Sequence, residues 1–231
     1  MRVLAIDTST AWGSVAVVAA DGVVAERAAR VPGAHLEWLI PTIDALLTAA
    51  GLTRDQIDGL AVSIGPGGFS GLRIGLTTAA AWAHALGRPL AAVSTLEVIA
   101  AGVPTSGLVL AVLDARRGEV AAALFGRDQD LHRLTDDLLV EPAALHQALP
   151  PIAEPVVLAG DALERYGEAL AAALAPQAVV AEPSVWWPRA SVLGGLARAR
   201  LLRGERDDPV GLVPRYARRP VVSADPGQEP A

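Results

Sequence analysis

Two aspartates, Asp7 and Asp114, stand where two similar apolar segments end, LAID and LAVLD. Carboxylates at strand ends that face a cleft are suited to hold a magnesium ion, or its water molecules, near a nucleotide phosphate. A structural explanation is also available, in which Asp7 caps its own turn and Asp114 pairs with Arg116 or Arg117. The residues alone leave both explanations open.

A glycine-rich segment, GPGGFSGLRIG, covers residues 65–75 between an apolar stretch and a helical pattern. A strand, a glycine loop and a helix start can point several N–H groups at one place, which suits an anion or a closely packed backbone. The segment lacks the lysine of a Walker A loop, and its spacing differs from the dinucleotide-binding fingerprint. It is therefore either a structural turn or an anion-binding loop. The candidate contacts of an anion or nucleotide are Asp7, Thr8, Ser9, Gly65, Gly67, Gly68, Arg73 and Asp114. For Arg73, the alternative is that its side chain pins the loop through carbonyl groups.

The composition excludes several kinds of chemistry. The chain of 231 residues has no cysteine, and all 19 of its basic residues are arginine. Thiol nucleophiles, cysteine-ligated zinc and Schiff-base lysines are therefore excluded. No two of the four histidines have the i, i+4 spacing of a helical metal pair. We predict no catalytic residue and no metal site, and we expect structural roles for the histidines.

The charge and the N-terminus bear on partners and location. The net charge of −6 does not favour binding of a polyanion by the surface as a whole. A role with RNA would therefore need a local arginine patch or a basic partner. Asp7 inside the apolar N-terminus argues against a signal peptide, and no apolar run reaches the roughly 18 residues of a spanning helix. We expect a soluble cytoplasmic protein without membrane contact.

The order of predicted elements is the same in both halves, β-β-β-α-β-α-β-α. Alternating apolar residues predict strands over 2–8, 13–19, 23–31, 60–64 and 90–93, and helical spacing predicts helices over 35–50, 72–86 and about 95–101. The second half repeats this order from strand 108–115 to a last helix over 190–203. Two such halves indicate an α/β fold of the actin-like (ASKHA) class, in which two ribonuclease-H-like lobes each have a mixed five-stranded sheet flanked by helices.

We place the domain boundaries accordingly. The N-terminal lobe covers residues 1–104, with the glycine loop and the two long helices. The C-terminal lobe covers 105–219, and its last helix is a candidate to pack back on the first lobe. Residues 220–231 are rich in Pro, Gly and acidic side chains, which predicts a disordered tail.

The first two long helices have faces that one sheet cannot bury completely. Helix 35–50 has a wide apolar face, and helix 72–86 is rich in small residues, which let another helix approach closely. Leftover apolar surface usually marks a partner site. The residues predicted for such an interface are Leu36, Leu39, Ile40, Ile43, Leu47, Leu72, Ile74, Thr78 and Trp82.

Several motifs together resemble the TsaB family, formerly called YeaZ. They are AIDTS, H-x-E-x-x-I-P-x-I from residue 35, GPGGFSGLRIG, PLAAVSTLE, LDARRGEV and PRYARRP, and they span residues 3 to about 219. The loop motif is the most specific of them, and Gly68 stands where the family often has serine.

The resemblance implies a non-catalytic dimerisation subunit for threonylcarbamoylation at N6 of adenosine 37 in ANN-decoding tRNAs. It implies pairing with a catalytic TsaD-like paralogue, or with a second copy when alone, through the first two helices. It also implies a TsaE-like ATPase as a further partner, only indirect contact with tRNA, and ATP or ADP only in the complex. The alternative hypothesis is an ATP-dependent small-molecule kinase of the actin superfamily, which the two aspartates and the glycine loop would support.

Overall fold

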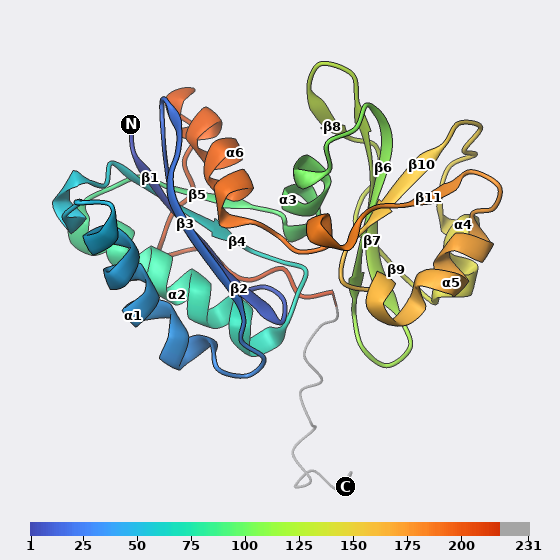
Figure 1. Ribbon diagram of the computed structural model, residues 1–231, viewed down its shortest axis with the longest axis horizontal. Helices are drawn as coiled ribbons and strands as arrows, with labels where there is room; N and C mark the ends of the chain where they lie inside the picture. Colours follow the sequence, from blue (N-terminus) through green and yellow to red (C-terminus); the bar gives the residue numbers. More distant parts are fainter. Residues whose placement is uncertain (218–231) are drawn as a thin grey trace, which may run out of the picture.

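The computed structural model of the chain describes residues 1–217, and Figure 1 shows two lobes side by side. Each lobe contains one β-sheet with helices on both of its faces. The tail expected over 220–231 lies outside the described residues.

The first lobe is built on a mixed five-stranded sheet in the order β3-β2-β1-β4-β5. Its strands are β1 (Val3–Asp7), β2 (Trp12–Ala19), β3 (Gly22–Arg30), β4 (Gly59–Ser63) and β5 (Leu90–Val93). The first three strands pair antiparallel, as a meander joined by tight turns. Because β4 and β5 run parallel to β1, Asp7 and the glycine-rich loop lie at the carboxyl ends of neighbouring strands, on the same side of the sheet.

Two long helices cover one face of this sheet. They are α1 (His35–Ala49) and α2 (Phe69–Leu86), and a short 3-10 helix, η1 (Arg54–Gln56), follows α1. Pro41 lies inside α1, which continues through it as one helix. Gly87 caps the end of α2, and its φ of 60° is the left-handed conformation that glycine adopts without strain. The sequence predicts both helices.

The second lobe has six strands. They are β6 (Gly107–Asp114), β7 (Val120–Arg127), β8 (Leu131–Arg133), β9 (Leu138–Val140), β10 (Val156–Ala159) and β11 (Ala178–Val180). The sheet order is β11-β10-β6-β7-β8, and β9 also pairs with β7. The sheet thus has one strand more than the five expected, because β8 pairs with the end of β7 and the additional short strand β9 pairs with its beginning. One face of this sheet is covered by η2 (Pro142–Ala144), α4 (Leu145–Ala148) and α5 (Leu163–Ala173).

The last helix of each half packs on the sheet of the other half. α3 (Thr95–Gly102) places Leu96 and Ile99 in a core cluster with strands β6 and β7. α6 (Ala190–Leu202), which follows the 3-10 helix η3 (Pro183–Val185), places Leu193 and Ala197 against β1 and β2. Both helices therefore lie between the two sheets, as Figure 1 shows.

Polar contacts fix each of these two helices on its sheet. Glu26 of β3 accepts hydrogen bonds at the start of α6 from the Ser191 N–H, at 3.0 Å, and from Arg189 Nη2, at 2.6 Å. Burial raises the pKa of Glu26, but the hydrogen bonds from Arg189 and Ser191 outweigh it, so the pKa lies below its usual value. Arg127 of β7 donates to the Ala100 and Val103 carbonyls at the end of α3. These charge-assisted bonds satisfy backbone groups that helix ends leave without partners.

Among residues 1–217, no helix is both long and apolar enough to cross a membrane.

Candidate functional site

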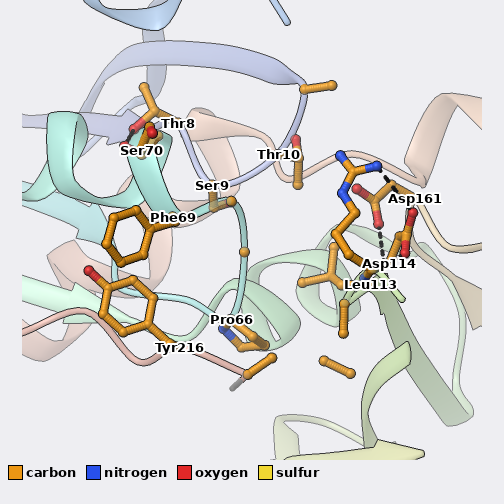
Figure 2. A pocket seen from close by; sticks show the side chains of 18 of the residues that line it. Thr8, Ser9, Thr10, Pro66, Phe69, Ser70, Leu113, Asp114, Asp161 and Tyr216 are labelled. Atoms are coloured by element: carbon orange, nitrogen blue, oxygen red, sulfur yellow. Dashed lines mark hydrogen bonds and ion pairs between the residues drawn. The ribbon is translucent and has the colours of Figure 1, made fainter. Parts of the chain in front are cut away.

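A cavity of about 470 Å³ lies between the two lobes. Its wall comes from the turn after β1, the glycine-rich loop, the start of α1, the β6–β7 turn and the end of the described chain. Figure 2 shows Ser9 and Pro66 on one side, with Asp114 and Asp161 on the other. The cavity therefore occupies the cleft that the two-lobed arrangement predicts.

Asp7 does not belong to the wall of this cavity. Its side chain is fully buried, and its Oδ1 accepts hydrogen bonds from the Ser9 N–H at 3.0 Å and from the Ser9 hydroxyl at 2.8 Å. Its Oδ2 accepts a hydrogen bond from the Ser63 hydroxyl. Burial raises the pKa of Asp7, against the lowering effect of these hydrogen bonds. The structure thus favours the explanation in which Asp7 caps its own turn, and it does not place this carboxylate where an anion or metal in the cavity would meet it.

The glycine-rich loop packs directly on the backbone of the turn after β1. A Cβ atom on Gly67 would collide with the Ser9 carbonyl, and one on Gly71 would collide with the Thr8 carbonyl. The Gly68 N–H donates to the Ser9 carbonyl at 2.7 Å, and the Thr8 hydroxyl donates to the Gly71 carbonyl at 2.7 Å. The chain's own backbone therefore accounts for the glycines, which favours the structural turn over the anion-binding loop.

Of the other residues predicted to contact an anion or nucleotide, some lie on the cavity wall and others do not. Thr8 and Ser9 line the cavity, but their hydroxyls donate to the Gly71 carbonyl and to Asp7. Gly65 packs against the carbonyl of Arg215 and is not on the cavity wall, whereas Gly67 and Gly68 are.

Arg73 holds the C-terminal segment instead of the loop carbonyls. Its guanidinium lies 3.9 Å from the ring centre of Phe69, and its Nε donates to the Tyr216 hydroxyl at 2.8 Å. The Phe69 and Tyr216 rings stack with their centres 5.0 Å apart, as Figure 2 shows. Neither of the two roles considered for Arg73 from the sequence includes this contact. Tyr216 was missed because nothing in the residue pattern relates it to a loop more than 140 residues earlier.

Asp114 and Asp161 form an acidic pair on the second-lobe side of the cavity. The Asp114 N–H donates to Asp161 Oδ1 at 2.8 Å. Asp114 accepts the Arg116 N–H at 2.8 Å, and it forms an ion pair with the Arg116 guanidinium at 3.4 Å. The pairing of Asp114 with Arg116 is the structural explanation considered from the sequence. Burial is the main reason that the pKa of Asp161 is raised to about 6; the hydrogen bond from the Asp114 N–H lowers the pKa, and the charge of Asp114 has a smaller raising effect.

Sequence reasoning missed Asp161. The available signal was an aspartate just after the apolar strand VVLA, since Asp7 and Asp114 likewise stand at the ends of apolar strands.

The predicted interface residues of α1 and α2 fall into two groups. Leu39, Ile43, Leu47 and Leu72 are at most 3% exposed and belong to the chain's own core. Their side chains already fill the space between the helices and the sheet, and their contact with a partner stays a prediction. Leu36 and Ile40 are 67% and 40% exposed, and Ile74, Thr78 and Trp82 are half-buried. Helical periodicity could not separate the two groups, because both belong to one wide apolar face.

Comparisons with known proteins agree on one family. A family model described as TsaD, tRNA N6-adenosine threonylcarbamoyltransferase, matches residues 14–223. The tRNA threonylcarbamoyladenosine biosynthesis protein TsaB of Bacillus subtilis is 31% identical over 94% of this chain and 94% of its own length. An uncharacterized protein of Mycobacterium leprae, ML0378, is 47% identical over 122 residues, which are 51% of this chain and 33% of that protein.

Solved structures support the same fold. YeaZ from Pseudomonas aeruginosa superposes with a TM-score of 0.82 at 29% identity, over 93% of this chain and 99% of that one. The activator of 2-hydroxyisocaproyl-CoA dehydratase from Clostridium difficile, with a TM-score of 0.51 at 12% identity over 88% of this chain and 97% of that one, shares the fold alone. The actin-like fold class predicted from the order of elements is confirmed.

Replacing Gly67 by alanine should destabilise the protein, whereas replacing Gly68 by serine should not. The Gly67 Cβ would overlap the Ser9 carbonyl, and such overpacking costs about 1–3 kcal/mol, which for a chain of this size lowers the melting temperature by roughly 2–12 °C. A Gly68 Cβ has room, and a serine there can cap α2, since its φ and ψ are −66° and 128°. Thermal unfolding of both variants measures the difference, and equal melting temperatures would contradict the packing described for the loop.

Replacing Asp161 by asparagine should stabilise the protein at pH 8. Because the folded pKa of about 6 lies above the unfolded value of 3.8, the folded state binds the extra proton, and stability falls as the pH rises between these values. Asparagine can still accept the Asp114 N–H, so the gain above pH 6 should reach up to about 3 kcal/mol and vanish near pH 4. Urea unfolding from pH 4 to pH 8 measures it. A gain independent of pH would show that the carboxylate does not titrate in this way.

Proposed function

The chain belongs to the TsaB (YeaZ) family, and from this premise we propose that it serves tRNA threonylcarbamoyladenosine synthesis as a non-catalytic subunit that binds a TsaD-like catalytic subunit. The relative from Bacillus subtilis carries the name of that biosynthesis. The other proposed partners are a TsaE-like ATPase and, in the absence of these proteins, a second copy of the chain. In this proposal tRNA is bound by the cytoplasmic complex.

The observation that carries the proposal is the exposed apolar surface of α1 beside α2. Leu36 and Ile40 lie one turn apart on α1, and both are exposed large apolar side chains. On α2, which packs next to α1, the exposed ridge has the small residues Thr77, Ala81 and Ala85. Small exposed residues on one helix and exposed apolar side chains on its neighbour suit the close approach of a helix pair from a partner.

Two features of the site support a subunit without chemistry of its own. The carboxylate of Asp7 accepts hydrogen bonds from hydroxyl groups of its own lobe, and the glycine-rich loop packs on the chain's own backbone. The residues that first suggested phosphate chemistry thus have structural partners. In the proposal, the catalytic groups are those of the TsaD-like subunit.

The cavity between the lobes favours the alternative, a small-molecule kinase of the actin superfamily. Its volume and the two carboxylates of Asp114 and Asp161 are the observations in support. Against it, these carboxylates already pair with backbone N–H groups and with Arg116. We therefore propose that the chain alone binds no nucleotide and that ATP or ADP enters only in the complex.

Calorimetry with Mg-ATP distinguishes the proposed subunit from a kinase. Tight binding by the isolated chain that is lost in the variant Asp114→Ala would favour the kinase.

Replacing Leu36 and Ile40 together by aspartate should abolish pairing without unfolding the chain. Both side chains are exposed, so the free energy of unfolding should change by less than about 1 kcal/mol, whereas two buried carboxylates in an interface should weaken binding at least about a hundredfold. Size-exclusion chromatography with the TsaD-like subunit measures pairing, and circular dichroism checks the fold.

The matched control is Val179→Asp, which changes an exposed valine on β11 in the other lobe. It should pair like the unchanged chain. Co-elution of the Leu36/Ile40 double variant at micromolar concentration would contradict the proposed surface, and no pairing by the unchanged chain would contradict the proposed function.

A further inference from the structure

The chain that follows α6 runs along the first lobe without regular secondary structure. Residues 205–217, here called the C-terminal strap, contain no helix and no strand, and their pairing with the sheet is a single β-bridge between Asp207 and Leu90. Figure 1 shows the strap running from the end of α6 back to the space between the lobes. Individual contacts therefore hold it, and not a continuous ladder of backbone hydrogen bonds.

These contacts lie at the two ends of the strap. At its start, the Asp207 N–H donates to the Leu90 carbonyl at 2.8 Å. At its end, the Arg215 N–H donates to the Ile64 carbonyl at 2.7 Å, and the Tyr216 ring forms the stack described above. Among the described residues, the hydrogen bonding of 208–214 stays within the strap.

The middle of the strap is poorly packed on the lobe. A hollow of about 350 Å³ lies between it and α2, and another of about 360 Å³ lies between it and β8, the start of α3 and α6. Val210 and Val213 are 82% and 70% exposed, whereas Leu212 packs against the core of the lobe. A segment with few buried apolar side chains opens locally at a lower free energy than the whole fold.

The strap borders both the exposed surface of α2 and the cavity between the lobes. Thr77 and Ala81 of the small-residue ridge line the same hollow as Val210. At the other end of the strap, Tyr216 and Ala217 line the cavity between the lobes. A protein that packs on the ridge therefore meets the strap, and the position of the strap decides whether one wall of the cavity is complete.

We propose that the C-terminal strap opens and closes in the isolated chain and that a TsaD-like subunit bound on α1 and α2 holds it closed. The inference rests on the proposed function and adds regulation of the cavity to it. In the open state Tyr216 leaves the cavity wall, and in the closed state Val210 faces the partner. Because the partner contacts only the closed strap, pairing shifts this equilibrium, and by reciprocity a loosened strap weakens pairing.

Hydrogen exchange followed by mass spectrometry tests the two states, with and without the TsaD-like subunit. In the isolated chain, the Asp207 and Arg215 amides should exchange at least about a hundredfold faster than those of β4, although both donate backbone hydrogen bonds. Pairing should slow the exchange of the strap at least about tenfold and leave that of β10 in the other lobe unchanged.

Two variants loosen the strap from opposite ends. Tyr216→Ala removes the stack and the hydrogen bond from Arg73, and Asp207→Ala removes the acceptor of the Ala92 N–H on β5. Each should speed the exchange of the strap and weaken pairing about tenfold, since a smaller fraction of the chain is closed. The matched control is Tyr166→Ala, which removes the chain's other tyrosine, half-buried on α5. It should leave strap exchange and pairing within about twofold of the unchanged chain.

Strap exchange as slow as that of β4, or exchange that pairing does not slow, would overturn this inference and leave the proposed function standing. Weaker pairing in both variants without faster strap exchange would assign Tyr216 and Asp207 to direct partner contact and would also overturn it. Normal pairing by a variant whose strap exchanges faster would do the same. Failure of the unchanged chain to pair would overturn both proposals.

Discussion

The close packing of the glycine-rich loop on the turn after β1 is the contact on which the rest of the structure depends. The Gly67 and Gly71 positions touch the carbonyls of Ser9 and Thr8 so closely that no side chain fits between the two segments. This contact sets where α2 begins, and α2 in turn positions α1 beside it and the Phe69–Tyr216 stack at its start. The exposed helix surface and one wall of the cavity are therefore fixed by backbone atoms of a single turn.

Residues that look suited to phosphate chemistry have been used here to build a rigid frame. Asp7 orders its own turn, the Thr8 hydroxyl binds the loop, and Arg73 binds the C-terminal segment. The net effect is a lobe whose two long helices rest on a well-bonded base. For the partner binding that we propose, rigidity of this kind would keep the exposed helix surface in one conformation and lower the entropy lost on association.

Local patterns in the sequence predict the order of elements, both long helices of the first lobe and the fold class. They indicated the last helix only as a candidate to pack on the first lobe, and they did not predict which sheet receives α3, because periodicity identifies an apolar face but not the surface that covers it. For the same reason they grouped the buried Leu39 and Ile43 with the exposed Leu36 and Ile40. Asp161 and Tyr216 were missed because their importance comes from contacts between segments far apart in the chain.

The exchange of the two helices between lobes has a consequence for how the protein came to have its present form. A fragment ending at residue 104 would leave the inner face of the first sheet bare, because α6 supplies Leu193 and Ala197 to cover it. The second half would likewise lack Leu96 and Ile99 of α3. Neither half is thus a self-sufficient folding unit, although the two repeat the same order of elements. If the chain arose by gene duplication, the ancestral single copy had to associate with another copy of itself, and the fusion made that mutual dependence permanent.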